Sequence, residues 1–309
     1  MKIIFMGTPA FAVPSLEILL KKHTICAVVT QPDKPKGRGK KMAFSPIKEK
    51  ALEYDIEVLQ PLKVREENFI EKLKQYKADV IVVVAFGQIL PESILNMPQY
   101  GCINVHGSLL PKYRGAAPIQ WAVINGEKET GVTTMFMAKG LDSGDMILKE
   151  TIEILPEDTY GTVHDKMSIT GANLLEKTLD LLEQQKIVRT VQKEEESTYA
   201  PMITKETGHI DWSKNSDEIQ NLIRGLDPVP NAYTIYEEEV LKIWKVQKIE
   251  QIYETASFGE IVEVTKKGII VKTADGALLI CELQARGGKR MSCDAYMRGH
   301  EMKKGVILK

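Results

Sequence analysis

Apolar runs and amphipathic stretches alternate through the first half of the chain. The run ADVIVVVAFG (78–87) is continuous in Val and Ile, which is typical of a strand covered on both faces. Six further runs have the length and composition of strands: KIIFM (2–6), TICAVVT (24–30), IEVL (56–59), CINVH (102–106), VTTMFMA (132–138) and MILKETIEI (146–154).

Between these runs, apolar residues recur every three or four positions, which is the spacing of an amphipathic helix. Ser45 directly precedes Pro46, an order that suits an N-cap followed by the first helical residue. Helices are expected over residues 12–22, 45–54, 69–76 and 159–185. Strands and helices alternating at this pitch predict an α/β fold with a doubly wound, mostly parallel sheet. Ligands of such sheets bind at the carboxyl ends of the strands.

The pattern changes at about residue 189. Residues 189–207 have weak periodicity and clustered charge, as expected of a linker. One short helix follows at 216–226, and then five β-rich runs occupy 232–306. These runs fit a small antiparallel barrel of the oligonucleotide-binding type. We therefore expect a catalytic domain at 1–188, a linker at 189–207 and a barrel domain at 208–309.

The net charge of the 309-residue chain is −1, which argues against a general nucleic-acid coat protein. Positive charge is instead concentrated in QPDKPKGRGKK (31–41), where five cations accompany one anion. Glycine and proline in this stretch exclude a stable helix and predict a flexible basic loop. A solvated loop that merely aids solubility is the simpler interpretation of such a charge run.

The four cysteines show no CxxC spacing, which predicts reduced thiols and an intracellular protein without a disulfide framework or a metal site. The apolar N-terminus superficially resembles a signal peptide. However, Pro9, Pro14 and Glu17 interrupt it, and no stretch has the length of a membrane span. These features predict a cytoplasmic protein with no membrane partner.

A nucleotide cofactor is the first hypothesis for a sheet of this kind, and the sequence does not support it. The segment GTPAFAVP (7–14) after the first strand has one glycine where the dinucleotide fingerprint needs three. The chain also lacks a GxxxxGK[ST] phosphate-binding motif.

Candidate chemistry falls on two later segments. Asn104 and His106 alternate on one strand, so their side chains emerge on the same face at its carboxyl end. Asp142 and Asp145 flank Gly144 in a loop between two strands, where a turn-forming role explains either carboxylate equally well. A lone histidine on a strand is more often a core residue, but an asparagine two positions earlier favours a functional pair.

Asparagine, histidine and aspartate together suit acyl transfer to an amine. An amide N–H and an imidazolium can stabilise the oxyanion that forms, and a histidine beside a carboxylate can move the amine proton. Since no Ser or Cys is convincingly placed as a nucleophile, direct transfer is favoured over a covalent enzyme intermediate.

The run NVHGSLLPKYRGAAPIQWAVINGEKETGVTTMFMAKGLDSGDM (104–146) resembles the folate-dependent formyltransferases, with Asn-x-His, SLLPxYRG and LDxGD in order. GTPAFAVPSLEIL, QPDKPKGRGKK, SPIK and the C-terminal half narrow the resemblance to the branch that formylates methionyl-tRNA. It implies that Asn104, His106 and Asp142 are catalytic. The formyl group would move from N10 of 10-formyltetrahydrofolate to the α-amino group of methionine on initiator tRNA.

The resemblance also implies two walls of a folate site. The pterin would lie against the backbone of Phe86, Gly87, Gln88, Ile89 and Leu90. The opposite wall would be formed by Ser108, Leu109, Leu110 and Pro111. An ordinary strand-to-helix connection ending at Pro91 describes the first of these segments equally well.

Transfer RNA is the partner that the basic loop would meet, and the resemblance implies that the barrel domain at 208–309 also binds it. The loop leaves the second expected strand at the same carboxyl edge as the predicted catalytic residues. Phosphate contacts would come from Lys34, Lys36, Lys40 and Lys41, while the planar fork of Arg38 suits a specific contact. We expect the loop to become ordered when tRNA binds, and the enzyme to act as a monomer.

One segment departs from the family pattern. In the second domain, LDPVPNAYT carries Asp227 and Val229 where the resemblance implies an Asn-Pro-Trp-Pro-like sequence. The change from Trp to Val removes a large anchor from that domain.

Three alternatives remain open. A formyltransferase acting on a nucleotide-linked amino sugar would share the mechanism, but would have no use for five cations on one loop. The relative that formylates glycinamide ribonucleotide lacks the barrel-like domain. A non-catalytic RNA-binding protein would leave Asn104, His106 and Asp142 unexplained, and the barrel runs lack the stacking aromatic residues of a strand binder.

Overall fold

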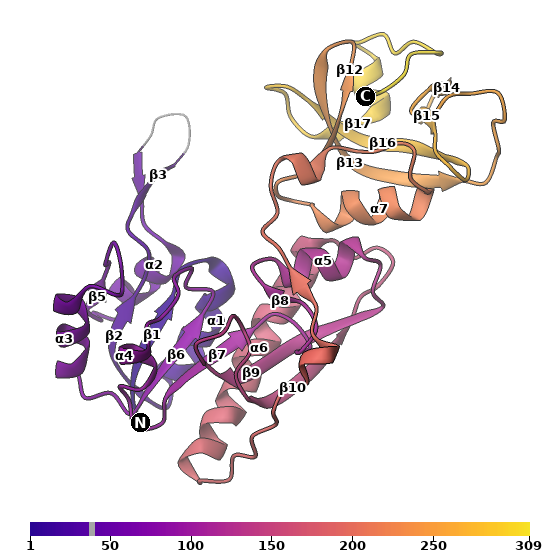
Figure 1. The fold of residues 1–309 in the computed structure, drawn as a ribbon. Coiled ribbons are helices and arrows are strands. Elements are labelled where there is room, and N and C mark those ends of the chain that lie inside the picture. The colour runs from indigo at the N-terminus through magenta and orange to yellow at the C-terminus, as the bar shows by residue number, and fades with distance from the viewer. Residues whose placement is uncertain (37–40) are drawn as a thin grey trace. The chain divides into compact units, whose positions relative to one another are not determined.

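The computed structural model describes residues 1–36 and 41–309. Contacts between Cα atoms divide the chain into two units (Figure 1). The first comprises Met1–Gly115, Thr130–Glu153 and His164–Ala200, and the second comprises Ala116–Glu129, Ile154–Val163 and Pro201–Lys309. Two short segments that precede His164 in the chain therefore belong to the second unit.

The first unit is built on a seven-stranded sheet with the order β10-β9-β7-β6-β1-β2-β5. The pairs β1–β2, β1–β6, β2–β5 and β6–β7 are parallel, and β7–β9 is antiparallel. The predicted doubly wound, mostly parallel sheet is confirmed. Its strands are β1 (Lys2–Gly7), β2 (Thr24–Val29), β5 (Val58–Leu59), β6 (Val80–Val84), β7 (Cys102–His106), β9 (Glu129–Phe136) and β10 (Met146–Glu153).

Helices cover this sheet because alternate strand residues present apolar side chains to each face. Leu73 of α3 and Ile94 of α4 pack in one buried cluster with Ile4, Met6 and Ile81. The helices of this part of the chain are α1 (Val13–Leu20), α2 (Pro46–Glu53), α3 (Glu67–Gln75), α4 (Glu92–Leu95) and α6 (Tyr160–Glu183), with a 3-10 turn at Ala10–Ala12. Ser45 caps α2 as predicted, because its hydroxyl accepts a hydrogen bond from the Lys48 N–H at 3.1 Å.

The ends of the basic stretch are paired, which corrects the prediction of a flexible loop throughout. β3 (Lys34–Lys36) and β4 (Lys41–Ala43) form a two-stranded antiparallel ladder (Figure 1). Strands of three residues rich in Lys and Pro lack the apolar alternation by which a strand is recognised in sequence. Arg38 and Lys40 lie outside the described residues.

The second unit contains an antiparallel sheet with the order β12-β13-β16-β15-β14, to which β17 adds beside β16. This confirms the prediction of antiparallel β-structure in the C-terminal part. The strands are β12 (Ala232–Tyr236), β13 (Glu239–Ile249), β14 (Ile261–Thr265), β15 (Gly268–Lys272), β16 (Ala277–Ala285) and β17 (Met291–Ser292).

Helix α7 (Ser216–Gly225) packs against this sheet and also against α5 (Pro118–Ile124). Asn215 and Glu218 form a capping box at the start of α7. Gly225 allows the close approach of α5, since a Cβ there would lie 2.5 Å from the Ile124 side chain. The remaining short elements are β8 (Arg114–Gly115), β11 (Tyr199–Ala200), α8 (Cys293–Met297) and 3-10 turns at Glu194–Glu196 and Glu206–Gly208.

Among the helices of residues 1–36 and 41–309, none combines the length and apolar character needed to cross a membrane.

Candidate functional site

Asn104 and His106 lie at the carboxyl end of β7, as predicted, and are 9% and 6% exposed. Helix α6 covers the opposite face of this strand, because a Cβ on its Gly171 would lie 3.0 Å from the Val105 side chain. Val105 alternates with Asn104 and His106 along the strand. The two polar side chains therefore emerge on the face turned away from α6.

Each nitrogen atom of the His106 ring faces an oxygen atom. Nε2 lies 3.0 Å from the carbonyl oxygen of Tyr113, and Nδ1 lies 3.6 Å from Oδ2 of Asp142. A carbonyl oxygen can only accept a hydrogen bond, so Nε2 carries a proton in either charge state. The nitrogen that gains and loses a proton is therefore Nδ1, which faces the carboxylate.

Asp142 occupies the loop between β9 and β10 with a left-handed backbone, φ = 46°. Its Oδ2 atom accepts a hydrogen bond from the Gly115 N–H at 2.9 Å. This contact orients the carboxylate toward His106, and the two predicted partners come together. Asp145, the other acidic residue of the loop, accepts a hydrogen bond from the Phe136 N–H through its backbone carbonyl, 2.9 Å away.

The side-chain amide of Asn104 is available to a ligand. In the part of the chain that the structure describes, it has no hydrogen-bond partner within the protein. An amide N–H at the end of a strand, beside an imidazole, can stabilise negative charge that develops on a carbonyl oxygen.

Thr133 of β9 holds the turn at Ser108–Pro111. Its buried hydroxyl donates to the Ser108 carbonyl oxygen at 2.7 Å and accepts from the Leu110 N–H at 3.2 Å. Lys149 adds a hydrogen bond from Nζ to the Leu110 carbonyl oxygen. Desolvation by burial lowers the pKa of this lysine. The turn is thus fixed from its neighbouring strands.

The backbone at residues 86–90 is held through its first carbonyl group. The Phe86 oxygen accepts hydrogen bonds from Thr8 Oγ1 at 3.2 Å and from Gln31 Nε2 at 3.1 Å. Gly87 has φ = 86°, in the region that favours glycine. Ile89 is 83% exposed, although Phe86 and Leu90 on either side are buried. The segment therefore presents one large apolar side chain next to a fixed backbone.

A polar cluster anchors the base of the β3–β4 hairpin. Lys48 Nζ lies 2.6 Å from Asp33 Oδ2, and Gln60 Nε2 donates to Asp33 Oδ1 at 2.8 Å. The hydrogen bond from Lys48 lowers the pKa of Asp33, with Gln60 acting in the same direction. Gln60 also donates to the backbone carbonyl of Gln31 at 3.0 Å, which links the hairpin base to the residue that holds Phe86.

The structure also brings residues to this site that the sequence did not single out. Thr198 accepts a hydrogen bond from the Tyr113 N–H through its hydroxyl at 2.8 Å. Gln192 lies against the Asp142 loop, with hydrogen bonds to its backbone. Both residues fall in the segment expected to be a linker. A single Gln or Thr in a charged stretch has no spacing signal that could have indicated this role.

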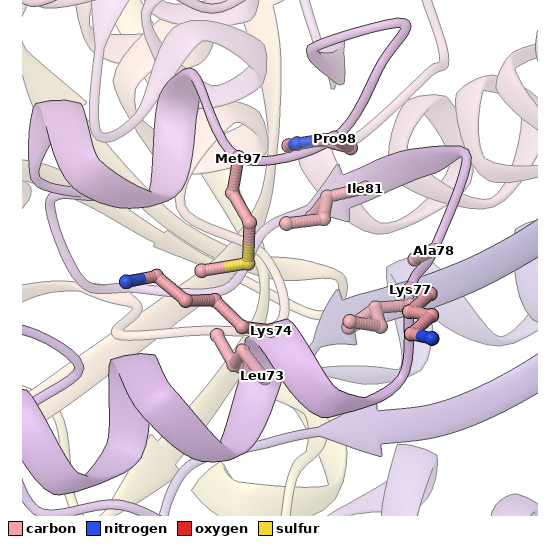
Figure 2. Close-up of a pocket in the computed structure, with 8 residues that line it drawn as sticks. Leu73, Lys74, Lys77, Ala78, Ile81, Met97 and Pro98 are labelled. Atoms are coloured by element: carbon pink, nitrogen blue, oxygen red, sulfur yellow. The ribbon is translucent and has the colours of Figure 1, made fainter.

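A cavity of about 230 Å³ lies in the first unit (Figure 2), and none of these groups is among the residues that line it. Its lining includes Ile4 of β1, Ile81 of β6 and Leu73, Lys74 and Lys77 at the end of α3. Ile4 and Ile81 belong to the amino-terminal halves of their strands, whereas His106 ends β7. The cavity therefore includes none of the predicted site residues.

Comparisons with known proteins agree along the whole chain. Residues 1–179 match the formyl transferase family and residues 202–301 match the formyl transferase C-terminal domain. Proteins named methionyl-tRNA formyltransferase from Caldanaerobacter subterraneus subsp. tengcongensis and Clostridioides difficile are each 53% identical, with full coverage of both chains. Among solved structures, the sugar 3N-formyl transferase WlaRD, crystallised with dTDP and 5-N-formyl-THF, aligns with a TM-score of 0.67. It is 23% identical and covers 92% of this chain and 97% of its own.

Proposed function

The chain belongs to the formyltransferase family, and from that premise we propose that it is a methionyl-tRNA formyltransferase. It transfers the formyl group of 10-formyltetrahydrofolate to the α-amino group of methionine on initiator tRNA. The product is the N-formylmethionyl-tRNA used to start translation. The observation that carries the proposal is the His106–Asp142 pair beside Asn104, in a chain alike over its full length to relatives of that name.

His106 and Asn104 act on the formyl group in this proposal. The Asn104 amide donates a hydrogen bond to the formyl oxygen as negative charge develops there, and the imidazolium that His106 becomes on taking the amine proton stabilises the same charge. The proton on Nε2 stays with the Tyr113 carbonyl, so proton movement takes place at Nδ1. Nδ1 of His106 takes the proton that the amine loses as its nitrogen bonds to the formyl carbon, and Asp142, which faces Nδ1, stabilises the resulting imidazolium. The imidazolium then gives that proton to N10 as the bond between N10 and the formyl carbon breaks and tetrahydrofolate leaves.

The folate co-substrate fits between the two fixed backbone segments. Phe86, Gly87, Gln88, Ile89 and Leu90 offer an apolar side chain on an anchored backbone, and Ser108, Leu109, Leu110 and Pro111 form a turn held by Thr133. A flat ring system with polar edges is complementary to such a site, because stacking needs apolar surface and the ring edges need backbone donors and acceptors. The formyl group is then presented to Asn104 and His106.

Transfer RNA is bound by the basic hairpin, that is, the basic stretch of residues 31–41. Lys34, Lys36, Lys40 and Lys41 contact phosphates and position the acceptor end, while Arg38 makes a bidentate contact. The anchored hairpin base explains how a short segment delivers the aminoacyl end to a defined place. The enzyme acts as a monomer in the cytoplasm, where aminoacylated tRNA is available.

An amino-sugar substrate is the competing function. The structural likeness to a sugar formyltransferase is one of fold, at 23% identity. The full-length relatives at 53% identity are named methionyl-tRNA formyltransferase. In addition, five cations in one short stretch suit a polyanionic substrate. These observations favour tRNA as the acceptor.

The decisive assay supplies purified protein with 10-formyltetrahydrofolate and either methionyl initiator tRNA or a UDP-linked amino sugar. Formylation of the methionyl-tRNA is expected, with no product from the sugar. Formylation should weaken steeply as the salt concentration rises, because cation–phosphate contacts are screened. Turnover of the sugar alone would replace the proposal with its competitor, and the absence of both products would exclude formyl transfer to either class.

A further inference from the structure

Gln192 is a buried side chain whose amide group contacts the loop that carries Asp142. It is 8% exposed, although the residues on either side of it are exposed. Its Nε2 atom donates one hydrogen bond to the Asp142 carbonyl oxygen and one to the Gly144 carbonyl oxygen, each 2.8 Å long. Both hydrogens of the amide are therefore used on backbone groups of one loop.

Arg114 fixes which way this amide points. Its Nε atom donates to Oε1 of Gln192 at 3.0 Å, and its guanidinium also contacts Glu194 at 2.8 Å. A guanidinium only donates hydrogen bonds, so the amide oxygen must face Arg114 and the NH2 group must face the loop. Arg114 is 8% exposed, so the orientation is set by a buried charged group.

The Asp142 loop needs such support because its backbone is tightly constrained. Asp142 is in the left-handed region, and a Cβ on Gly144 would lie 1.9 Å from the Phe136 carbonyl oxygen. A non-glycine residue with positive φ is disfavoured unless its surroundings hold it. The Gln192 side chain binds the backbone of the loop, while the Gly115 N–H binds the Asp142 carboxylate.

One strand pair joins these supports. β8 (Arg114–Gly115) pairs in parallel with β11 (Tyr199–Ala200), and the Arg114 N–H donates to the Thr198 carbonyl oxygen at 2.8 Å. The chain from Gln192 to Ala200 is therefore fastened to the segment that carries the Tyr113 carbonyl and the Gly115 N–H.

We infer that Gln192, oriented by Arg114, is a positioning residue that holds Asp142 in register with His106. The role is indirect, since Gln192 contacts the backbone of the loop rather than His106 itself. The inference rests on the proposed function, because the step that it supports is proton movement during formyl transfer.

Gln192→Glu is the sharpest test, because the side chain keeps its shape but places carboxylate oxygen against two carbonyl oxygens. Misplacement of Asp142 should lower kcat by about 10–100-fold. The KM for 10-formyltetrahydrofolate should stay within about twofold, since the predicted folate walls are untouched. Gln184→Glu is the matched control, since Gln184 is exposed at the end of α6 and the charge change is the same. It should leave kcat unchanged.

A double-mutant cycle with Asp142→Asn separates positioning from general damage to the structure. Rates are measured under single-turnover conditions with excess enzyme, so that slow variants remain measurable. If Gln192 acts through Asp142, Gln192→Glu should lower the rate of formyl transfer by less than about twofold in the Asp142→Asn background. An equal loss in both backgrounds would overturn the inference, as would a Gln192→Glu enzyme with the wild-type kcat.

Gln192→Leu repeats the cycle without introducing a charge, and it replaces Gln192→Glu if that variant does not fold. The two hypotheses fail in different ways. A wild-type enzyme that does not formylate methionyl-tRNA would remove the proposed function. An active wild type with a slow Asp142→Asn variant and a normal Gln192→Leu variant would remove only the positioning role.

Discussion

The Nε2 atom of His106 lies 3.0 Å from the carbonyl oxygen of Tyr113, and this contact fixes the tautomer of the ring. Proton exchange is confined to Nδ1, which faces Asp142 at 3.6 Å. Thr198 holds Tyr113 in turn, through a hydrogen bond to its N–H. The tautomer of His106 is therefore set by the backbone carbonyl of Tyr113, which a substitution of the Tyr113 side chain does not remove.

Replacement of His106 by Ala is expected to lower the rate of formyl transfer by at least about 10³-fold, since both charge stabilisation and proton transfer are lost. Affinity for methionyl-tRNA should stay within about twofold, because the proposed phosphate contacts lie on the basic hairpin. The rate is measured from formylmethionyl-tRNA formed, and affinity from filter binding. His300→Ala, in the second unit, serves as the control. Full turnover by His106→Ala would exclude a catalytic role for this residue.

Thr133 and Thr134 are neighbouring buried residues of β9 whose hydroxyls hold different parts of the structure. Thr133→Val removes the group that binds the Ser108 oxygen and the Leu110 N–H, leaving two buried polar groups unpaired. An unpaired buried group costs about 1–3 kcal/mol, so the turn should loosen and the KM for 10-formyltetrahydrofolate should rise about 10-fold.

Thr134→Val is the matched control for this prediction. Its hydroxyl bonds to Thr178 Oγ1 and to the Leu148 N–H, away from the turn. We expect a lower Tm from this variant, with the KM for the formyl donor unchanged. Steady-state kinetics and thermal unfolding check both variants. Equal KM values for the two variants would show that the 108–111 turn does not form part of the folate site.

Lys48→Met should weaken the use of tRNA without changing the use of folate. The substitution removes the ammonium group that holds Asp33 at 2.6 Å, so the base of the hairpin loses its principal ion pair. The KM for methionyl-tRNA is expected to rise about 3–10-fold, corresponding to about 1 kcal/mol. Arg38→Ala, which removes the proposed bidentate contact, should raise the same constant or lower turnover.

Lys50→Met provides the control on the same helix, because Lys50 pairs with Glu17 and Glu53 instead of Asp33. Kinetics with varied tRNA and with varied folate separate the two effects. A rise in the KM for folate alone would mean that the hairpin base supports the 86–90 segment through Gln31 rather than the tRNA contact.

Elements marked by a local sequence pattern could be predicted, whereas an element that depends on distant contacts could not. The β6 run and the cap at Ser45 are local patterns, and the structure has both. Helix α5 was missed because PIQWAVI is short and almost wholly apolar, without the polar face that marks an amphipathic helix. What stabilises it is packing against α7, nearly 100 residues later in the chain.

The candidate site shows the same limit. Asn104, His106 and Asp142 stand in compact motifs, and the structure brings His106 and Asp142 within 3.6 Å. Gln192, in contrast, contacts the Asp142 loop although it lies 50 residues later in the chain, in a segment with the composition of an exposed linker. Contacts of this kind depend on the chain path, which a single sequence does not report.

Asp227 occupies a position where the family pattern implied an asparagine, and its charge is expected to cost stability. The residue is 9% exposed, and burial raises the pKa of its carboxyl group, against the opposing influence of Arg290. At pH values between the ordinary carboxyl pKa of 3.8 and the raised pKa, the folded state therefore binds more protons at this site than the unfolded state. Stability falls as the pH rises from 3.8 to the raised pKa, and the penalty persists at higher pH.

Asp227→Asn removes that charge while keeping the shape of the side chain. The Tm at pH 7 should rise by about 2 °C, and the difference from wild type should shrink as the pH falls below the raised pKa and vanish below 3.8, where the carboxyl is protonated in both states. Arg290 retains Glu282 at 2.7 Å, so it is not left unpaired. Thermal unfolding followed by circular dichroism at several pH values measures both quantities.

Asp275→Asn is the control of opposite sign in the same unit. Burial works to raise the pKa of Asp275, but hydrogen bonds from Ser216 outweigh it and the pKa is lowered. Its charged form therefore stabilises the folded state at pH 7, and that contribution is lost as the pH falls below 3.8 toward the lowered pKa. Asp275→Asn should accordingly lower the Tm at pH 7. A lower Tm for both variants at pH 7 would show that the contact between Asp227 and Arg290 outweighs the cost of burying the carboxylate.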